Sequence, residues 1–275
     1  MSPPETQLPP EHIAYLQQHV YAGSGIVLDT EKQYLLEARL APILRERGLA
    51  SLHALCDVMR SMPPSLLHRQ VVEAMTTNET YFFREPAQYQ ALGDGILPEV
   101  IERRSATRKL SFWSAAASAG QEAYSLAMML LEKGLHNWHI EILGTDLSTR
   151  VLEQAQSARY SQLEVNRGLP VTMLLKYFRR VGLEWEVKEE VRRMVRFRPF
   201  DLRSGMRSLG PFDVVFCRNV LIYFDMVTKK RILEEIHGSL FRGGHLLVGT
   251  TEAGLPSADR YQRQTIGNTV VYVAS

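Results

Sequence analysis

Residues 75–85 read MTTNETYFFRE, and this stretch marks the change between two kinds of sequence. It surrounds the aromatic block Tyr81–Phe83 with hydroxyl, amide and charged side chains. Such a segment is too polar for a core strand and too aromatic for a plain linker. Helical spacing precedes it, and alternating strand-like and helical patterns follow it. A polar and aromatic junction between two domains is a natural place to close over a small molecule.

The chain before this junction, residues 1–75, predicts a small all-helical domain. After a proline-rich start, apolar residues recur at steps of three and four. Four helices are expected: one from about residue 11, one capped at residues 29–31 and ending near residue 48, one over 51–62 and one over 66–75. Pro42 falls inside the second helix and is expected to kink it.

The chain after the junction predicts an α/β domain over residues 91–275, and residues 76–90 are interpreted as a linker that forms a lid. Strand patterns alternate with helical ones, which favours a doubly wound, mainly parallel, Rossmann-like sheet. A small β insertion is expected at about 179–198, with strands over 184–188 and 191–198, and a terminal antiparallel hairpin around Gly267-Asn268. Another helix is expected over 87–102. The main strands are expected at Lys109–Trp113, Glu141–Asp146, Phe212–Cys217 and His245–Val248.

The composition fits a soluble, cytoplasmic globular protein. Among 275 residues, 45% are hydrophobic and 23% are charged, and the net charge of +2 is too small to argue for nucleic acid. The two cysteines are scattered, as suits a reducing compartment. The N-terminus lacks the pattern of a signal peptide, and no apolar run approaches the roughly 20 residues that span a bilayer. We therefore expect no direct membrane insertion.

Polar side chains occur where consecutive predicted strands end, the edge at which doubly wound sheets bind ligands. Asp146 ends the second strand, and an acid there commonly accepts hydrogen bonds from ribose hydroxyls. The loop after the first strand lacks GxGxxG, so a pyrophosphate cradle is not indicated. A ligand with a ribose, a cationic group and no diphosphate fits this pattern, and S-adenosylmethionine fits better than NAD. The residues at the four ends are Glu122, Asp146, Asp201-Leu202 and Arg218-Asn219.

Each of these residues also has a structural explanation. Glu122, near a helix start, is favourable to the helix dipole. Asp201 could cap a turn, and Asn219 could make local loop hydrogen bonds. Asp146 could cap the next helix, although Ser148 is better placed to do so. Their joint occurrence is what favours a cofactor site.

Four segments together resemble the CheR-type chemoreceptor glutamate methyltransferases, over residues 12–275. The resemblance implies S-adenosylmethionine as cofactor and S-adenosylhomocysteine as product. It implies an enzyme, a protein-glutamate O-methyltransferase, whose partner is the cytoplasmic helical region of membrane chemoreceptors. The segments are MTTNETYFFRE (75–85), FWSAAASAGQEAYSLAM (112–128), GTDLSTRVLEQA (144–155) and GPFDVVFCRNVLIYFD (210–225).

The resemblance also implies cofactor contacts in the first half of the α/β domain. Asn78, Thr80 and Arg84 resemble the contacts to the methionine end of the cofactor. Glu122 resembles the acid near the amino acid moiety of the cofactor, and Asp146 matches the ribose acid.

Further contacts are implied in the second half. Asp201 and Leu202 match the pair beside the adenine, where the family often has Asn-Leu. Arg218 and Asn219 match the contacts after the fourth strand. Tyr223 matches a tyrosine placed near the acceptor carboxylate.

The chemistry that the resemblance implies needs no general base. A glutamate with a reference pKa of about 4.3 is already ionised at pH 7 and can attack a sulfonium methyl in line. The enzyme can act by orienting the reactants and removing water. We hypothesise that Arg84 and Tyr223 are catalytic because they hold that carboxylate without protonating it.

Two departures bear on receptor recognition. In some family members a glycine-rich loop in the β insertion docks a receptor C-terminal pentapeptide. Residues 179–188 have one glycine, Gly182, and are too short for that loop, so no strong pentapeptide binding is predicted. The helix over 32–47 keeps basic residues that the family often presents to acidic receptor helices, although a solvated helix face explains them equally well. They are Lys32, Arg39, Arg45 and Arg47.

Other readings have less support. A methyltransferase for a base or small molecule would usually carry an aromatic clamp or Asn/Asp-Pro-Pro-Tyr after the fourth strand, where this chain has CRNVLIYF. A non-catalytic adaptor that senses the cofactor is opposed only by Arg84 and Tyr223. His136 and His139 lack further ligands, so no metal site is predicted. Cys217 is read as a buried thiol.

Overall fold

The computed structural model describes residues 8–28, 33–254 and 260–275. The chain divides into two compact units, which are described separately. A helical unit comprises Met1–Thr77 together with Tyr223–Asp225. An α/β unit comprises Asn78–Ile222 and Met226–Ser275. The chain therefore first passes from one unit to the other inside the segment MTTNETYFFRE.

The helical unit contains the helices that the sequence predicted, with Pro42 inside the second of them. Ser51 caps the third helix, because its hydroxyl accepts a hydrogen bond from the Ala54 amide at 3.2 Å. The cap expected at residues 29–31 lies outside the described residues. The helices are α1 (Pro10–Ser24), α2 (Gln33–Arg47), α3 (Leu52–Ser61) and α4 (Leu66–Met75).

A short segment from the far end of the sequence completes the helical unit. Phe224 forms an antiparallel bridge with Ile26, and the Val27 amide donates to the Tyr223 carbonyl at 2.9 Å. The Tyr21 hydroxyl donates to the Asp225 carboxylate at 2.7 Å. Tyr223 also packs against the core of this unit.

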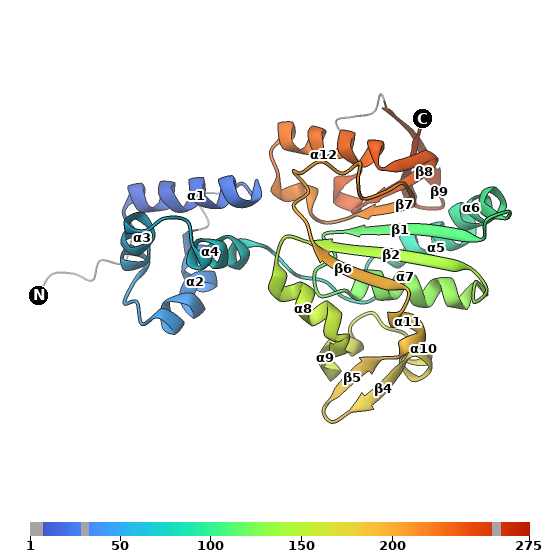
Figure 1. The fold of residues 1–275 in the computed structure, drawn as a ribbon, viewed down its shortest axis with the longest axis horizontal. Helices are drawn as coiled ribbons and strands as arrows, with labels where there is room; N and C mark the ends of the chain where they lie inside the picture. The colour runs from blue at the N-terminus through green and yellow to red at the C-terminus, as the bar shows by residue number, and fades with distance from the viewer. Residues whose placement is uncertain (1–7, 29–32, 255–259) are drawn as a thin grey trace, which may run out of the picture. The chain divides into compact units, whose positions relative to one another are not determined.

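The α/β unit is built on a seven-stranded sheet with the order β6-β2-β1-β7-β8-β10-β9 (Figure 1). Neighbouring strands from β6 to β8 are parallel, and β10 is antiparallel to both β8 and β9. The predicted doubly wound sheet with a terminal hairpin is therefore confirmed. Its strands are β1 (Lys109–Ala115), β2 (His139–Asp146), β6 (Val195–Pro199), β7 (Phe212–Cys217), β8 (Leu240–Val248), β9 (Tyr261–Ile266) and β10 (Thr269–Ala274).

The helices of this unit connect the strands, and one differs from expectation. The single helix predicted over 87–102 is instead three segments, because a π-helical turn interrupts it. Gly95 lies in that turn, where a Cβ atom would be 2.5 Å from the Ile266 side chain, so a glycine allows the close approach. The segments are α5 (Pro86–Gln90), η2 (Ala91–Ile96) and α6 (Leu97–Arg104), followed by α7 (Gln121–Glu132), α8 (Thr149–Ser157), α12 (Met226–Gly238) and η4 (Thr250–Glu252). The short helix η3 (Leu221–Tyr223) begins in this unit, and its last residue belongs to the helical unit.

The expected β insertion is a three-stranded antiparallel sheet with the order β3-β5-β4. The strand predicted over 191–198 is wrong in its first half, because α11 (Glu189–Arg192) occupies it and β6 then joins the main sheet. Two glutamates in the first turn of α11 favour the helix. The other elements are β3 (Arg159–Tyr160), α9 (Gln162–Asn166), α10 (Val171–Tyr177), β4 (Phe178–Val181) and β5 (Glu184–Val187).

Candidate functional site

The carboxyl ends of β1, β2 and β7 lie side by side in the sheet. Ala115 at the end of β1 is in register with Thr145 of β2 on one side and with Cys217 of β7 on the other. The chain order reverses here, since β2 and β6 lie on one side of β1 and β7 and β8 on the other. A ligand crevice is expected at such a switch point.

Asp146 joins the end of β2 to the loop after β1. Its side chain is buried, one carboxylate oxygen accepting from the Ser118 amide at 2.9 Å and the other from the Ser148 amide at 3.0 Å. Ser148 occupies the N-cap position of α8, as expected, but its hydroxyl makes no capping hydrogen bond there. Asp146 therefore fixes the rim of this crevice.

The loop after β1 adopts an unusual backbone conformation. Ala116, Ser118 and Gly120 have φ values of 63°, 49° and 90°. At Gly120 a Cβ atom would lie 2.9 Å from the Ala155 side chain, so only glycine fits between the loop and α8. Left-handed non-glycine residues are costly and cluster at ligand sites. The loop after β1 is therefore held in a fixed, strained conformation.

The segment MTTNETYFFRE contributes to the same rim. The Ser118 hydroxyl donates to the Asn78 carbonyl at 2.8 Å. Asn78 and Thr80 line a cavity of about 270 Å³. The remaining lining residues are Glu79, Ser118, Ala119, Gln121, Arg150, Val151, Gln154, Glu164 and Arg167.

The aromatic block of this segment is an anchor. The Phe82 ring is fully buried and packs edge-on against Tyr160 and Phe178 at centroid distances of 4.9 and 5.6 Å. The Phe83 amide donates to the Ser125 hydroxyl at 3.0 Å. Burial of a phenylalanine stabilises a fold by roughly 1.5–3 kcal/mol. The hydrophobic content of the segment therefore holds its polar residues in place.

Arg218, after β7, is the centre of a buried charge network. One guanidinium nitrogen lies 2.9 Å from a Glu122 oxygen, and another donates to the Arg84 carbonyl and lies 3.6 Å from the Glu85 carboxylate. Ser114 donates to the other oxygen of Glu122 at 2.7 Å. Glu122 and Arg218, predicted as separate ligand contacts, are thus partners of each other.

Burial dominates the electrostatics of this network. It raises the pKa of Glu122 above its ordinary value, even though the Arg218 charge acts in the opposite direction. Burial also acts to raise the pKa of Glu85, but hydrogen bonds from Thr250 and the Arg218 charge outweigh it and leave that pKa lowered. Arg218 compensates carboxylates that the site could not otherwise bury.

Two acids that the sequence reasoning missed support Asn219, which has a φ of 56°. The Asn219 amide donates to Glu252 at 2.6 Å, and its side chain donates to Glu85 at 3.2 Å. Glu252 also accepts from the amides of Gly249 and Ile222. Asn219 was expected to make hydrogen bonds within its own loop. Its hydrogen bonds are instead made to acids that are distant in sequence.

Asp201 and Leu202 follow β6. Asp201 forms an ion pair with Arg203, whose terminal nitrogen lies 2.6 Å from the Asp201 carboxylate. The backbone carbonyl of Asp201 accepts a hydrogen bond from the Ser204 amide at 2.9 Å. Leu202 is buried. Asp201 thus stabilises a turn, as one of its two interpretations expected. The Phe200 amide donates to the Asp146 carbonyl, which holds this turn at the site.

The two residues predicted to be catalytic belong to different units. Arg84 is half-buried in the α/β unit, where it donates to the Glu79 carbonyl at 3.0 Å and its guanidinium carbon lies 5.6 Å from the Tyr81 ring centroid. Tyr223 belongs to the helical unit. Their joint action on a carboxylate stays a prediction.

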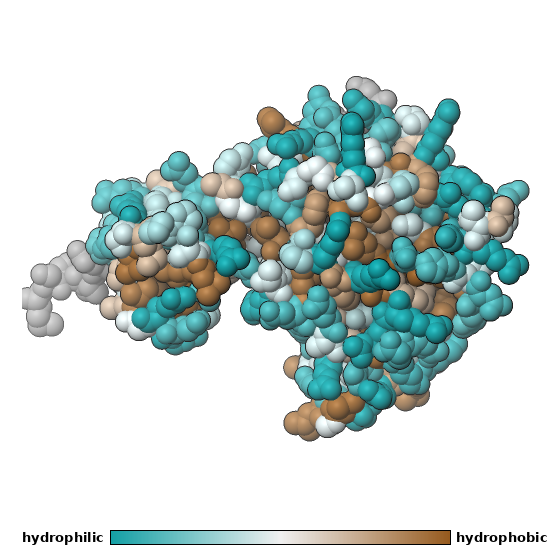
Figure 2. All heavy atoms as spheres, viewed as in Figure 1, coloured by the Kyte–Doolittle hydropathy of each residue, from teal (hydrophilic) through white to brown (hydrophobic). Residues whose placement is uncertain are grey.

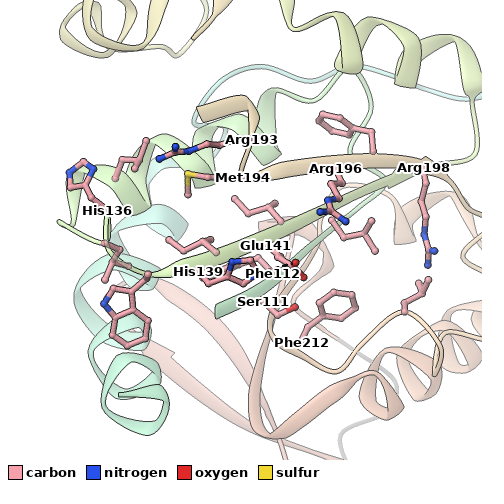
Figure 3. A pocket seen from close by; sticks show the side chains of 18 of the residues that line it. Ser111, Phe112, His136, His139, Glu141, Arg193, Met194, Arg196, Arg198 and Phe212 are labelled. Atoms are coloured by element: carbon pink, nitrogen blue, oxygen red, sulfur yellow. Dashed lines mark hydrogen bonds and ion pairs between the residues drawn. The ribbon is translucent and has the colours of Figure 1, made fainter. Parts of the chain in front are cut away.

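A cavity of about 660 Å³ lies elsewhere, on the face of β1, β2 and β6 (Figure 3). Residues 200–211, which follow β6, form no helix. Apolar residues are visible between polar ones on the surface over these strands (Figure 2). His136 and His139 line this cavity, and His139 lies 3.1 Å from Glu141. Because its lining comes from the length of the strands, this hollow does not match a cofactor crevice at their carboxyl ends.

Comparison with known proteins covers nearly the whole chain. The model of the CheR methyltransferase SAM-binding domain matches residues 78–270, and that of the CheR methyltransferase all-alpha domain matches residues 11–76. The chain is 41% identical to chemotaxis protein methyltransferase Cher2 of Pseudomonas putida, and the match covers 91% of this chain and 93% of that protein. Chemotaxis protein methyltransferase 1 of Pseudomonas aeruginosa is also 41% identical, over 91% and 93% of the two chains.

Proposed function

Because the chain belongs to the CheR methyltransferase family, we propose that it methylates glutamate side chains in the cytoplasmic helical region of membrane chemoreceptors. It is an S-adenosylmethionine-dependent methyltransferase of chemotaxis, and S-adenosylhomocysteine is its product. Among the helices of the described residues, none is both long and apolar enough to cross a membrane.

The observation that carries the proposal is the placement of Asp146. Its carboxylate lies at the switch point of a doubly wound sheet, held by two backbone amides and next to the cavity lined by Asn78 and Thr80. An acid in this position suits a ribose. Asp146 would orient the ribose, and Asn78, Thr80 and Arg84 would contact the methionine end of the cofactor.

The buried network fits the remaining cofactor contacts. Arg218 and Glu122 neutralise each other, so together they can line the site of a zwitterionic amino acid moiety without adding a net charge. Carboxylate oxygens of Glu122 retain lone pairs for one further donor. Asn219 would contribute beside them, and Asp201 and Leu202 would lie beside the adenine.

The residues of this chain would then act on the glutamate. Bound S-adenosylmethionine supplies an electrophilic methyl group on a sulfonium. The glutamate is ionised at neutral pH, so the protein has to orient it and exclude water rather than remove a proton. We assign that role to Arg84 and Tyr223.

The proposal is tested by methyl transfer from labelled S-adenosylmethionine to receptor-containing membranes. Label released as methanol by mild base identifies γ-methyl esters. A receptor in which the accepting glutamates are replaced by alanine is the control and should remain unlabelled. Tight cofactor binding without transfer would indicate an adaptor, and labelling of a small molecule alone would indicate a different acceptor.

Replacing Arg84 by alanine should separate catalysis from cofactor binding. We expect kcat for receptor methylation to fall by about 100-fold, because the acceptor loses its orientation. The affinity for S-adenosylhomocysteine, measured by calorimetry, should fall by less, by about tenfold at most, because Arg84 is one of several proposed contacts to the methionine end of the cofactor. Tyr223→Ala should behave alike, and the exposed Arg159→Ala is the control. An equal loss of affinity and turnover would defeat the assignment.

The β insertion is not expected to bind a receptor C-terminal pentapeptide. Val181 pairs directly with Glu184, so only Gly182 and Leu183 connect β4 to β5. A two-residue turn leaves no room for the glycine-rich loop that docks the pentapeptide in some family members. We expect a dissociation constant weaker than about 100 μM by calorimetry. A low-micromolar value would contradict this prediction.

The helical unit is a better candidate than the β insertion for contact with the receptor. Fewer of its basic residues are available for that contact than the sequence suggested. Arg39 donates to the Met75 carbonyl at 2.7 Å and to the Thr77 hydroxyl at 2.8 Å, so it braces its own unit. Arg47 donates to Gln70 at 2.9 Å, and Arg45 is exposed. Lys32 lies outside the described residues. Arg45 and Arg47 remain on the exposed side of α2.

A further inference from the structure

We propose that His12, His53 and Asp57 form a binding site for a divalent transition-metal ion of the zinc class in the helical unit. His12 lies on α1, and the other two residues lie one turn apart on α3. One potential ligand atom from each residue lies within 4.8 Å of the other two. None of the three residues is among those that we assign to the methyl-transfer reaction.

The two histidines approach different oxygens of the Asp57 carboxylate. His12 Nε2 lies 3.5 Å from Asp57 Oδ1, and His53 Nε2 lies 3.3 Å from Asp57 Oδ2. Two ligands on a tetrahedral zinc ion, with bonds of about 2.0–2.1 Å, lie roughly 3.3 Å apart. The two imidazole rings meet edge-on, with centroids 4.4 Å apart. With one potential ligand atom from each residue within 4.8 Å of the other two, small side-chain shifts would bring all three to the spacing of metal ligands.

His12 supplies an independent observation that points to a ligand. Only 2% of this residue is exposed, and neither ring nitrogen makes a hydrogen bond within the described structure. Its Nε2 lies 3.5 Å from the Asp57 carboxylate without forming a hydrogen bond to it. A buried imidazole without a hydrogen-bond partner is costly. Coordination to a metal would satisfy one nitrogen.

The ligand types determine the class of ion. Two imidazoles and one carboxylate suit zinc and its neighbours in the transition series, whereas magnesium prefers oxygen ligands. The side chains of His53 and Asp57 are each 56% exposed, which leaves the fourth position open to water. Three protein ligands with an open position are typical of zinc sites that exchange a ligand.

The surrounding groups are compatible with this assignment. The neighbouring Cys56 is buried and is not among the side chains whose ligand atoms converge here, so it is not counted as a ligand. The nearby Arg60 is engaged elsewhere, because it donates to the Glu11 carbonyl at 3.0 Å and lies 4.7 Å from the Tyr15 ring centroid. A bound ion would tie α1 to α3 and so stabilise the helical unit.

The proposal is tested with the untagged full chain and zinc chloride. Calorimetry should show one zinc ion bound per chain, and cobalt chloride should give the intense visible absorption of a tetrahedral site. At 100 times its dissociation constant, zinc should lower the unfolding constant by about 100-fold. Magnesium chloride should do neither. His53→Ala and Asp57→Asn should each weaken zinc binding by more than about 100-fold.

Matched variants keep the test decisive. His53 and Asp57 are exposed enough for the apo variants to fold, which circular dichroism in chelator would verify. His139→Ala is the control, because His139 and Glu141 form an exposed imidazole–carboxylate pair at 3.1 Å elsewhere. It should bind zinc as the unmodified chain does. Equal zinc affinity in His53→Ala, or no binding to the unmodified chain below about 100 μM, would overturn the proposal.

Discussion

Arg218→Met should lower the free energy of unfolding by about 3–5 kcal/mol, the usual cost of breaking a buried ion pair. The Arg218 side chain is 1% exposed, and methionine fills much of its volume without its charge. Glu122 would then be buried against Ser114 alone, and Glu85 would lose a neighbouring cation. Urea denaturation at pH 7 measures the change.

The pH dependence gives this prediction a distinctive sign. Burial already raises the pKa of Glu122 in the folded protein, so its contribution to stability is present at low pH and is lost as pH rises through that pKa. Without Arg218 the pKa rises further. The lowered pKa of Glu85 would also relax. The stability gap between the variant and the unmodified protein should therefore narrow as pH falls from 7 toward 5.

A double variant identifies the cause. Glu122→Gln in the Arg218→Met background removes the uncompensated carboxylate and should recover more than half of the lost stability. Cofactor binding should stay impaired, because stability and affinity have different origins here. A gap that is constant with pH, or no recovery in the double variant, would show that lost packing rather than charge is responsible.

The sheet was predictable because its signals are local. The strand Phe212–Cys217 is buried along its whole length, and a short apolar run bounded by turn residues is typical of a buried parallel strand. The break in the helix after Pro86 was not predictable in this way. Gly95 in the π-helical turn lies close to Ile266, and a contact between residues so far apart in sequence leaves no local signal.

The site was predictable only in part, for the same reason. Asp146 could be found because strand ends converge in any doubly wound sheet. Glu85 and Glu252 could not be found in this way, because their hydrogen-bond partners are distant in sequence. Glu85 accepts from Thr250, 165 residues away, and Glu252 accepts from Asn219, 33 residues away. The sequence reasoning considered only His136 and His139 for a metal, whereas the pair of His12 and Asp57 spans two helices.

Asp146→Asn should weaken cofactor binding by about 100-fold, the largest effect expected of a single cofactor contact. A carboxylate that accepts from ribose hydroxyls contributes roughly 1.5–3 kcal/mol for each hydrogen bond to a charged group. The substitution also affects the rim. Both oxygens of Asp146 accept from backbone amides, whereas asparagine offers one acceptor and places an NH2 group against the other amide.

The effect on the rim predicts how the cofactor affinities of two Asp146 variants compare. Loss of a ribose contact alone would not predict this order. In Asp146→Asn the side-chain NH2 group would face the backbone N–H of Ser118 or Ser148, so two donors would oppose each other. In Asp146→Ala both backbone amides could bind water instead. Asp146→Asn should therefore bind S-adenosylhomocysteine no better than Asp146→Ala, although it is closer in shape. Calorimetry measures both affinities, with the exposed Asp94→Asn as control. Affinity within threefold of the unmodified protein for Asp146→Asn would remove Asp146 from the cofactor site and leave it a purely structural link between β2 and the loop after β1.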